Sequence, residues 1–218
     1  MSAHCPVTLA GETLWLLAEK AIYWPARRCL LIADAHFGKA AAYRSLGQPV
    51  PRGTTASNLL VLEGLLAKLD CERLIFLGDF LHGPGSQVEA TLAPLRAWRQ
   101  RHQALQVTLI RGNHDQRSGD PPADLDIEVV DEPLSLGPFA LCHDPVPHSG
   151  QHVLAGHVHP VYRLQGKGRQ SLRLPCFQLG HEVSLLPAFG AFTGGYRIAP
   201  MPDSRIYVVG EQRVWPVS

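Results

Sequence analysis

Five short polar motifs carry side chains that bind divalent metals, and each follows a short apolar run. They are Asp34-Ala35-His36, Gly78-Asp79, Gly112-Asn113-His114-Asp115, His143-Asp144 and Gly156-His157-Val158-His159. Carboxylate, imidazole and amide ligands without a thiolate suit Mn, Fe or Zn. The set therefore argues against a closed structural zinc site and predicts a catalytic metal centre.

The seven candidate ligands suit a pair of divalent cations. Two cations about 3.5–4 Å apart need one anionic ligand that bridges them, together with several neutral ligands. Further carboxylates would neutralise the cations and reduce their Lewis acidity. The candidates are two carboxylates, four imidazoles and one amide: Asp34, His36, Asp79, Asn113, His143, His157 and His159. His114 is not needed as a ligand, and its place beside Asn113 suits it to protonate a leaving oxygen.

Most of these motifs are weak signals when taken singly. An Asp-x-His or Gly-Asp pair occurs often by chance, and its Asp can instead cap a helix or its His belong to the core. The string Gly-Asn-His-Asp at 112–115 is far more specific, because four residue types are fixed at once. All five motifs in this order, each after an apolar run, make chance a poor explanation.

The apolar runs predict the strands that position the motifs. Runs of mostly Leu, Ile, Val and Phe at 29–33, 74–77, 107–110, 139–142 and 152–155 are typical of buried strands. An i, i+2 spacing at a strand end points both side chains to one face. We therefore expect Asp34 to lie beside His36, and His157 beside His159.

The segments between the runs are helical in the first half of the chain and rich in strands in the second. Leucines at helical spacing predict a helix over 58–69. Ser86 and Glu89 resemble a capping box for a second helix, within which Pro94 would cause a kink or a new start. After Pro160, strands are predicted at 172–174, 183–186 and 206–209.

Composition and charge narrow the class of protein. The 218 residues are 45% hydrophobic and 18% charged, with a formal net charge of +1. These values exclude a disordered chain and fit a single domain over residues 1–218. No apolar run reaches the ~20 residues of a membrane span, and the first residues lack the features of a signal peptide. Five widely separated cysteines without a C-x-x-C motif indicate reduced thiols, so we expect a cytoplasmic protein with no membrane segment.

The order of the motifs, D-x-H, G-D, G-N-H-D, H and G-H-x-H, resembles that of the calcineurin-like metallophosphoesterase superfamily over residues 29–159. Three segments, LLIADAHFGK, GDFLHG and LPAFGAFTGG, resemble more narrowly the bacterial ligase-associated DNA damage response endonuclease family. The resemblance implies an α/β (α+β) fold, a four-layer αββα sandwich of two β-sheets flanked by helices. His82 departs from the G-D-x-x-D pattern of many members, so a protein Ser/Thr phosphatase activity does not carry over.

The same resemblance assigns the ligands to two metals. Three residues belong to each metal: Asp34, His36 and His159 to one, and Asn113, His143 and His157 to the other. Asp79 would bridge the two metals, and His114 would be the general acid. The implied cofactor is a pair of divalent ions, manganese in the first place, with Fe or Zn as alternatives.

The implied activity is that of a DNA endonuclease in bacterial DNA repair, with a preference for single-stranded DNA. A hydroxide held between the metals would attack phosphorus in line. An ATP-dependent DNA ligase, a helicase and an exonuclease are the implied functional associates. Two alternatives stay open. One is a phosphodiesterase or phosphatase of nucleotides or other small phosphate esters. The other is a non-catalytic scaffold, which would be expected to have lost some of the eight positions that are filled here.

Residues beside the motifs are candidates for substrate contacts. Lys39, Arg52 and Arg111 could bind phosphates along a single strand, although a solvated loop explains each of them equally well. His82 would face the substrate or the ligands, although an ordinary loop histidine explains it equally well, and Asp115 would orient a ligand imidazole. Three aromatic residues are expected in the core rather than stacked on bases: Tyr43, Trp98 and Phe192. Because the net charge is close to zero, DNA affinity must come from the cations and a local basic rim.

Overall fold

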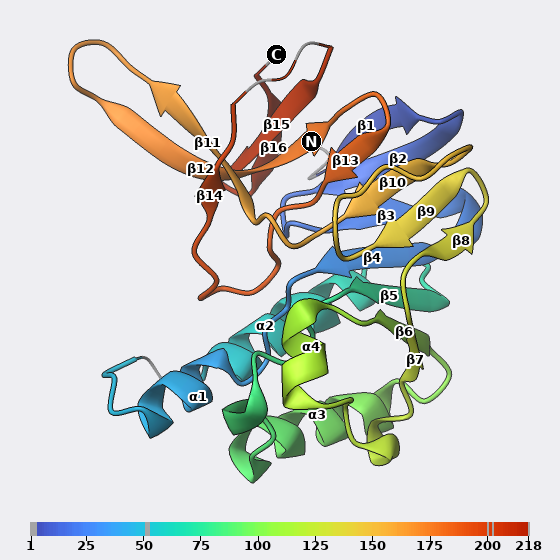
Figure 1. Ribbon diagram of the computed structural model, residues 1–218, viewed down its shortest axis with the longest axis vertical. Helices are drawn as coiled ribbons and strands as arrows, with labels where there is room; N and C mark the ends of the chain where they lie inside the picture. The colour runs from blue at the N-terminus through green and yellow to red at the C-terminus, as the bar shows by residue number, and fades with distance from the viewer. Residues whose placement is uncertain (1–3, 51–52, 200, 202, 218) are drawn as a thin grey trace.

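The computed structural model describes residues 4–50, 53–199, 201 and 203–217 and contains two β-sheets (Figure 1). The strands of the first sheet lie side by side in chain order: β1 (His4–Leu9), β2 (Glu12–Leu17), β3 (Ile22–Trp24), β4 (Cys29–Ala33), β5 (Arg73–Leu77), β6 (Gln106–Ile110) and β7 (Glu128–Val130). β1 to β4 pair antiparallel, and β4 to β7 pair parallel. β1 does not form an apolar run and was therefore not predicted, because buried Val7 and Leu9 alternate there with exposed Thr8.

The second sheet contains most of the strands after residue 130. Its order is β14 (Tyr196–Arg197), β11 (Pro160–Gln165), β12 (Ser171–Leu179), β13 (Val183–Leu185), β10 (His152–Ala155), β9 (Phe139–Cys142) and β8 (Leu134–Leu136). Two further strands extend it, β15 (Arg205–Gly210) beside β12 and β16 (Arg213–Pro216) beside β15. The strands predicted after Pro160 are thus confirmed.

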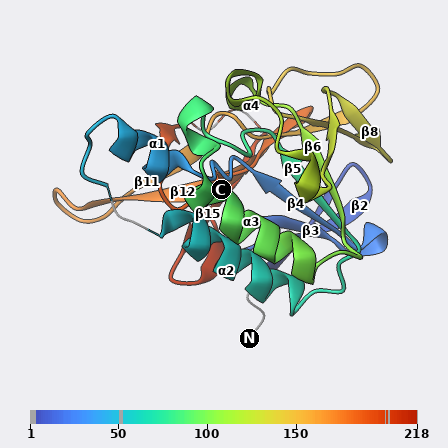
Figure 2. The ribbon, with the colours of Figure 1, turned by 90° about the horizontal axis from the view of Figure 1, so that it is seen from below.

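The α-helices of the described residues lie on the side of the first sheet (Figures 1 and 2). They are α1 (Lys39–Ser45), α2 (Thr54–Leu66), α3 (Glu89–Arg101) and α4 (Asn113–Ser118), with 3-10 turns at Pro25–Arg27, Pro84–Ser86 and Ala123–Leu125. α3 continues through Pro94. The predicted capping box is wrong, because the hydroxyl of Ser86 instead accepts the backbone N–H groups of His82 and Gly83. None of the described helices is both long and apolar enough to cross a bilayer.

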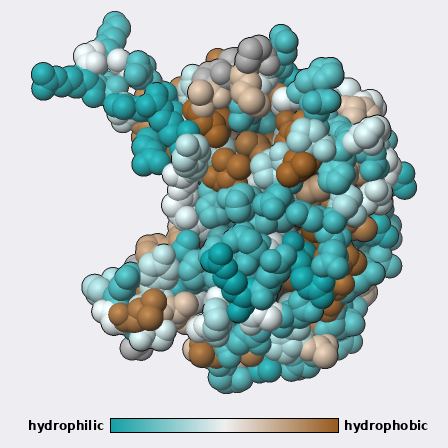
Figure 3. All heavy atoms as spheres, in the orientation of Figure 1, coloured by the Kyte–Doolittle hydropathy of each residue, from teal (hydrophilic) through white to brown (hydrophobic). Residues whose placement is uncertain are grey.

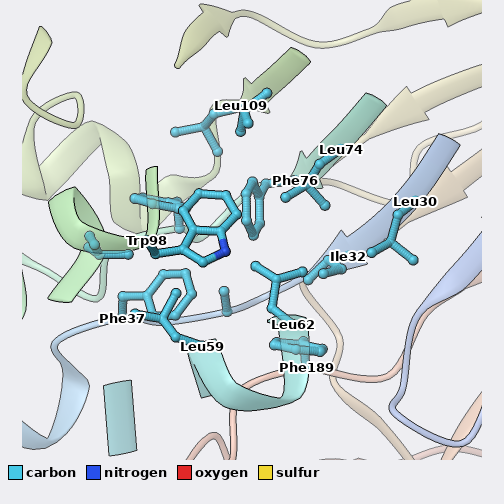
Figure 4. Close-up of a cluster of buried hydrophobic side chains, with 14 of the residues drawn as sticks. Leu30, Ile32, Phe37, Leu59, Leu62, Leu74, Phe76, Trp98, Leu109 and Phe189 are labelled. Carbon is cyan, nitrogen blue, oxygen red and sulfur yellow. The ribbon is translucent and has the colours of Figure 1, made fainter. Parts of the chain in front are cut away.

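Two large apolar clusters hold these layers together. One lies between the helices and the first sheet, where Trp98 packs among Phe37, Phe76 and Leu62 (Figure 4). The other lies between the two sheets around Trp24 and other large side chains. The predicted two-sheet sandwich is therefore confirmed. Within the described residues, the α-helices cover only the first sheet. A smaller cluster of buried residues on the second sheet contains small side chains such as Ala140 and Ala155.

Candidate metal centre

All five polar motifs meet where strands of the two sheets end. Asp34, Asp79 and the segment 112–115 follow the parallel strands β4, β5 and β6. His143 and the segment 156–159 follow β9 and β10, which are also parallel. Parallel neighbours end at the same edge of a sheet, so this topology brings residues up to 125 positions apart to one place.

Most of the ligand candidates adopt a left-handed backbone. Positive φ angles occur at Asp34 (54°), His36 (47°), Asp79 (52°), His157 (66°) and His159 (50°). Such a conformation costs about 1–3 kcal/mol at a residue other than glycine, and it clusters at functional sites. The prediction that Asp34 would lie beside His36 is correct, whereas the side chains of His157 and His159 belong to different donor groups. The stated reason is wrong, because the backbone has left the strand before each pair and the alternation of a strand no longer applies.

Glycines beside the ligands allow them to approach one another. A Cβ atom at Gly78 would lie 2.1 Å from Nδ1 of His143, and one at Gly112 would lie 2.4 Å from Oδ1 of Asp79. A Cβ atom at Gly156 would lie 2.8 Å from Oδ2 of Asp34. These glycines are therefore required by the close packing of the centre.

The first group of donor atoms comes from Asp34, His36, Asp79 and His159. One donor atom from each lies within 4.8 Å of the others. Nε2 of His36 is 3.3 Å from Nε2 of His159, which is 3.4 Å from Oδ1 of Asp34. This grouping matches the set that the resemblance assigns to one metal.

The second group comes from Asn113, His143 and His157. Nε2 of His143 is 2.9 Å from Oδ1 of Asn113 and 3.0 Å from Nδ1 of His157. Nδ1 of His157 is 3.1 Å from the same amide oxygen. Asp144 was not among the predicted ligands, yet its Oδ1 is 3.6 Å from Nδ1 of His157.

Asp79 lies between the two groups with one oxygen toward each. Its Oδ2 is 3.6 Å from Nε2 of His36, and its Oδ1 is 3.5 Å from Nε2 of His143. The backbone N–H of His114 donates to Oδ1 at 3.0 Å and fixes the carboxylate. This is the geometry that a bridging ligand requires.

The chemistry of this donor set fits two divalent cations. Asp34 and Asp79 are 0% and 2% exposed, and burial raises the pKa of Asp79 against the opposing field of His143. Burial also lowers the pKa of His36, which keeps that imidazole in the neutral form that binds metals. Imidazole nitrogens of this centre lie 3.0–3.3 Å apart, beside buried carboxylates. Cations among them would balance the buried negative charge and bind the lone pairs of the facing nitrogens.

Backbone groups orient the ligands. Nδ1 of His143 donates to the carbonyl oxygen of Leu77 at 3.1 Å, which leaves Nε2 as the ligating nitrogen. Glu132, which sequence analysis missed, accepts the backbone N–H of His143 at 2.6 Å and fixes the turn that carries this residue. The backbone N–H of His157 donates to Oδ2 of Asp34 at 3.0 Å. These bonds set the direction of each donor atom.

His114 and His82 form a stacked pair at the edge of the centre. Nδ1 of His114 donates to the carbonyl oxygen of His82 at 2.5 Å, and its Nε2 lies 3.9 Å from Oδ2 of Asp79. The two rings stack with centroids 4.8 Å apart, and the ring of Tyr43 also stacks on His82, with centroids 5.6 Å apart. Nδ1 of His82 is 3.3 Å from Nδ1 of His36. Burial, with the charge of Lys39, lowers the pKa of His82 to about 4, so its ring is neutral at pH 7.

Asp115 supports the centre in another way than predicted. It does not orient an imidazole but accepts the backbone N–H groups of Gly112 at 3.0 Å and Leu81 at 3.1 Å. Burial raises the pKa of Asp115 to about 6. The residue thus ties the loop after β6 to the loop after β5.

The predicted substrate contacts differ in their surroundings. Lys39 lies close enough for the charges of Asp34 and Asp79 to act on it, and its Nζ is 3.5 Å from the carbonyl oxygen of Thr193. Arg111 differs from the expectation, because its guanidinium is held by Asp120 and Asp131 and is not free for a phosphate. Arg52 lies outside the described residues. Of the aromatic candidates, Trp98 is in the core, Tyr43 is half-buried and Phe192 is exposed.

Two residues that sequence analysis missed hold the segment after β13 against the centre. Nζ of Lys20 donates to the carbonyl oxygens of Phe189 at 2.7 Å and Gly190 at 3.2 Å. The backbone N–H of Gly190 in turn donates to the carbonyl oxygen of Asp34 at 3.2 Å. The side-chain amide of Asn58 donates to the carbonyl oxygen of Ala35 and accepts the backbone N–H of Ala191. Neither residue belongs to a motif, so no local pattern marks it.

Comparisons with known proteins agree with this geometry. The family model described as calcineurin-like phosphoesterase matches residues 27–140. The crystal structure of the Pseudomonas putida nuclease MPE is 57% identical, covers 98% of this chain and 100% of its own, and superposes with a TM-score of 0.87. AQ665 of Aquifex aeolicus, a protein of unknown function, is 18% identical over 65% of this chain and 82% of its own, with a TM-score of only 0.34. No curated protein matches the chain. The chain therefore belongs to the calcineurin-like phosphoesterase family and is a metal-dependent phosphoester hydrolase.

Proposed function

We propose that the protein is a DNA endonuclease that depends on two divalent ions, manganese in the first place, and prefers single-stranded DNA. The observation that carries the proposal is the 57% identity to the Pseudomonas putida nuclease over 98% of the chain. A role in bacterial DNA repair, in the cytoplasm and alongside a ligase, a helicase and an exonuclease, belongs to the same proposal.

An open site favours a polymer over a small nucleotide as the substrate. Pockets for small ligands bury most of the ligand surface. The cavity beside His36, between Lys39 and Phe192, has a volume of only about 10 Å³ and cannot hold a nucleoside. The side chain of His157 is 44% exposed, so this member of the second donor group faces solvent. A strand that lies across this edge can reach the centre without entering a pocket.

The residues around the centre have distinct roles in the proposed reaction. Bound divalent ions would supply Lewis acidity and a lowered pKa of water. Asp34, Asp79 and the ligand histidines hold the ions, and Lys39 adds positive charge on the side of α1. The carbonyl oxygen of His82 keeps the proton of His114 on Nδ1, so Nε2 faces the centre. From there Nε2 of His114 would donate a proton to the departing oxygen.

One experiment tests the proposal directly. Single-stranded DNA, duplex DNA and a small chromogenic phosphodiester are each incubated with the protein under a panel of divalent metals. We expect endonucleolytic cleavage that is fastest with manganese and faster on the single strand. Hydrolysis confined to nucleotides or small esters would replace the proposal with its alternative, a small-ester phosphodiesterase.

A further inference from the structure

A basic hairpin projects from the sandwich beside the metal centre. It consists of β11, β12 and the turn at residues 166–170 between them, and it extends beyond the neighbouring strands in Figure 1. β11 begins at Pro160, directly after the ligand candidate His159, so the hairpin starts at the centre and runs outward. Residues 160–175 contain four basic side chains and no acidic one: Arg163, Lys167, Arg169 and Arg173.

Two of these basic residues lie directly opposite each other. Arg163 and Arg173 are register partners on β11 and β12, so their side chains share one face of the hairpin. Like charges in this position destabilise a strand pair. Arg163 donates to the hydroxyl of Ser171 and Arg173 to the carbonyl oxygen of Gly195, each at 3.0 Å. Within the described residues neither guanidinium contacts a carboxylate, so an anionic ligand would relieve their repulsion.

Some other arginines of the protein, in contrast, are neutralised by carboxylates. Five on and around the helical side of the first sheet each form an ion pair with at least one carboxylate: Arg28, Arg96, Arg99, Arg101 and Arg111. The hairpin, with four basic residues and no acidic one, is by contrast a local region of positive charge on a chain whose formal net charge is only +1.

The face that carries Arg163 and Arg173 is connected to the metal centre. Arg173 binds the carbonyl oxygen of Gly195, and the next residue, Tyr196, donates its backbone N–H to the carbonyl oxygen of His159 at 2.9 Å. Nζ of Lys39 on α1 lies 3.5 Å from the carbonyl oxygen of residue 193 in the same segment. Figure 3 shows the hairpin as a hydrophilic arm, with a hollow between it and the part of the molecule that contains α1.

We propose that the Arg163–Arg173 face of the hairpin binds the phosphate backbone of the DNA strand on one side of the phosphate that is cleaved. This proposal rests on the proposed function, because it names where the rest of the substrate lies. The six residues of β11 span roughly 20 Å at about 3.3 Å per residue, which is enough to follow several nucleotides. Guanidinium groups bind phosphate through paired N–H donors, and such binding is independent of sequence and weakened by salt.

The test compares two double variants of the full chain. R163Q/R173Q removes the opposed pair, and K68Q/R73Q is the matched control. Arg73 is the first residue of β5, whose other end leads to Asp79, and the exposed Lys68 lies five positions before it in the chain. Each variant is assayed for cleavage of single-stranded DNA at several salt concentrations, for affinity to a fluorescent oligonucleotide by anisotropy, and for hydrolysis of a small chromogenic diester.

We expect R163Q/R173Q to lose about tenfold or more in affinity and in kcat/KM on DNA. The slope of log K against log [salt] should become shallower by about 1.4, since each phosphate contact on a single strand contributes about 0.7. The small diester does not extend to the hairpin, so its kcat/KM should match that of the wild type, and K68Q/R73Q should match the wild type in every assay. K167Q/R169Q, at the tip of the hairpin, should also lose affinity and activity on DNA but not on the small diester. This variant tests the hairpin proposal if R163Q/R173Q does not fold.

The outcomes separate this proposal from the proposed function. Unchanged DNA affinity and salt slope in the hairpin variants would overturn the hairpin proposal and leave the endonuclease in place. A wild-type protein that hydrolyses the small diester but does not cut DNA would overturn the endonuclease. The anisotropy measurement would then still decide whether the hairpin binds a single strand. Equal losses on DNA and on the small diester would also count against the hairpin, because they would indicate damage to the centre.

Discussion

Nε2 of His143 lies 2.9 Å from Oδ1 of Asn113, although thirty positions separate the two residues in the chain. The contact joins the end of β9 in one sheet to the start of α4, which follows β6 in the other. Nδ1 of His143 is held by the carbonyl oxygen of Leu77, so its ring cannot turn away. The amide oxygen and the imidazole nitrogen therefore point to the same place.

This relationship predicts the effect of Asn113→Ala. Loss of the amide oxygen leaves the second donor group with two imidazoles and Asp79, so we expect one of the two divalent ions to bind at least about tenfold more weakly. Metal content after equilibrium dialysis and isothermal titration calorimetry measure this. Gln116→Ala, at an exposed position of the same helix, is the control and should bind two ions. Two ions of unchanged affinity in Asn113→Ala would remove Asn113 from the ligand set.

His114→Ala should affect catalysis without affecting metal binding. Its Nε2 faces Asp79 from 3.9 Å, and proton donation by such a group contributes about 10²–10⁴-fold to a rate. We expect a loss of that size on DNA, whose leaving alkoxide needs a proton, and a much smaller loss on a diester that releases 4-nitrophenol. Metal content should stay at two ions. Equal losses with both leaving groups would contradict the role of general acid.

The variants Gly78→Ala and Gly47→Ala distinguish the cost of backbone strain from the cost of a steric clash. The φ angles are nearly the same, +76° and +79°, so each substitution costs roughly 1 kcal/mol in backbone conformation. Only at Gly78 does the new Cβ meet another group, His143, whereas nothing lies within 4 Å of it at Gly47. We expect Gly78→Ala to lose metal affinity and more stability than Gly47→Ala, as measured by urea unfolding and calorimetry. Equal losses in the two variants would show that Gly78 is needed only for its positive φ angle.

Lys20 should make stability depend on pH above neutrality. Burial lowers its pKa to about 8, whereas the unfolded chain keeps a value of about 10.4. Between these values the unfolded state binds more protons than the folded state, so this residue makes the free energy of unfolding rise with pH, by at most about 3 kcal/mol. Urea unfolding at pH 7.5, 9 and 10.5 should show that the wild type gains stability relative to Lys20→Met across this range. Parallel pH profiles of the two proteins would contradict the prediction.

The sequence was informative about this protein where the signal is local. The buried strands β4, β5, β6, β9 and β10 are each a short apolar run, and such runs need no knowledge of the rest of the chain. The ligand candidates were found for the same reason, because Asp34, Asn113 and His157 each lie in a short motif directly after such a run. β1 was missed because buried and exposed residues alternate in it, and β3 was missed because it has only three residues.

The chain by itself thus determined which residue types come after which strands, and the motif order indicated the family. Only the tertiary structure decided how they meet, because the left-handed backbone at Asp79 and the positions of Glu132 and Lys20 depend on contacts between distant segments. It also decided which basic residues have a partner. Arg111 and Arg163 look alike in the sequence, but folding brings two carboxylates to Arg111 and another arginine to Arg163. The energy of a charge depends on its neighbours in space, and the linear sequence does not contain them.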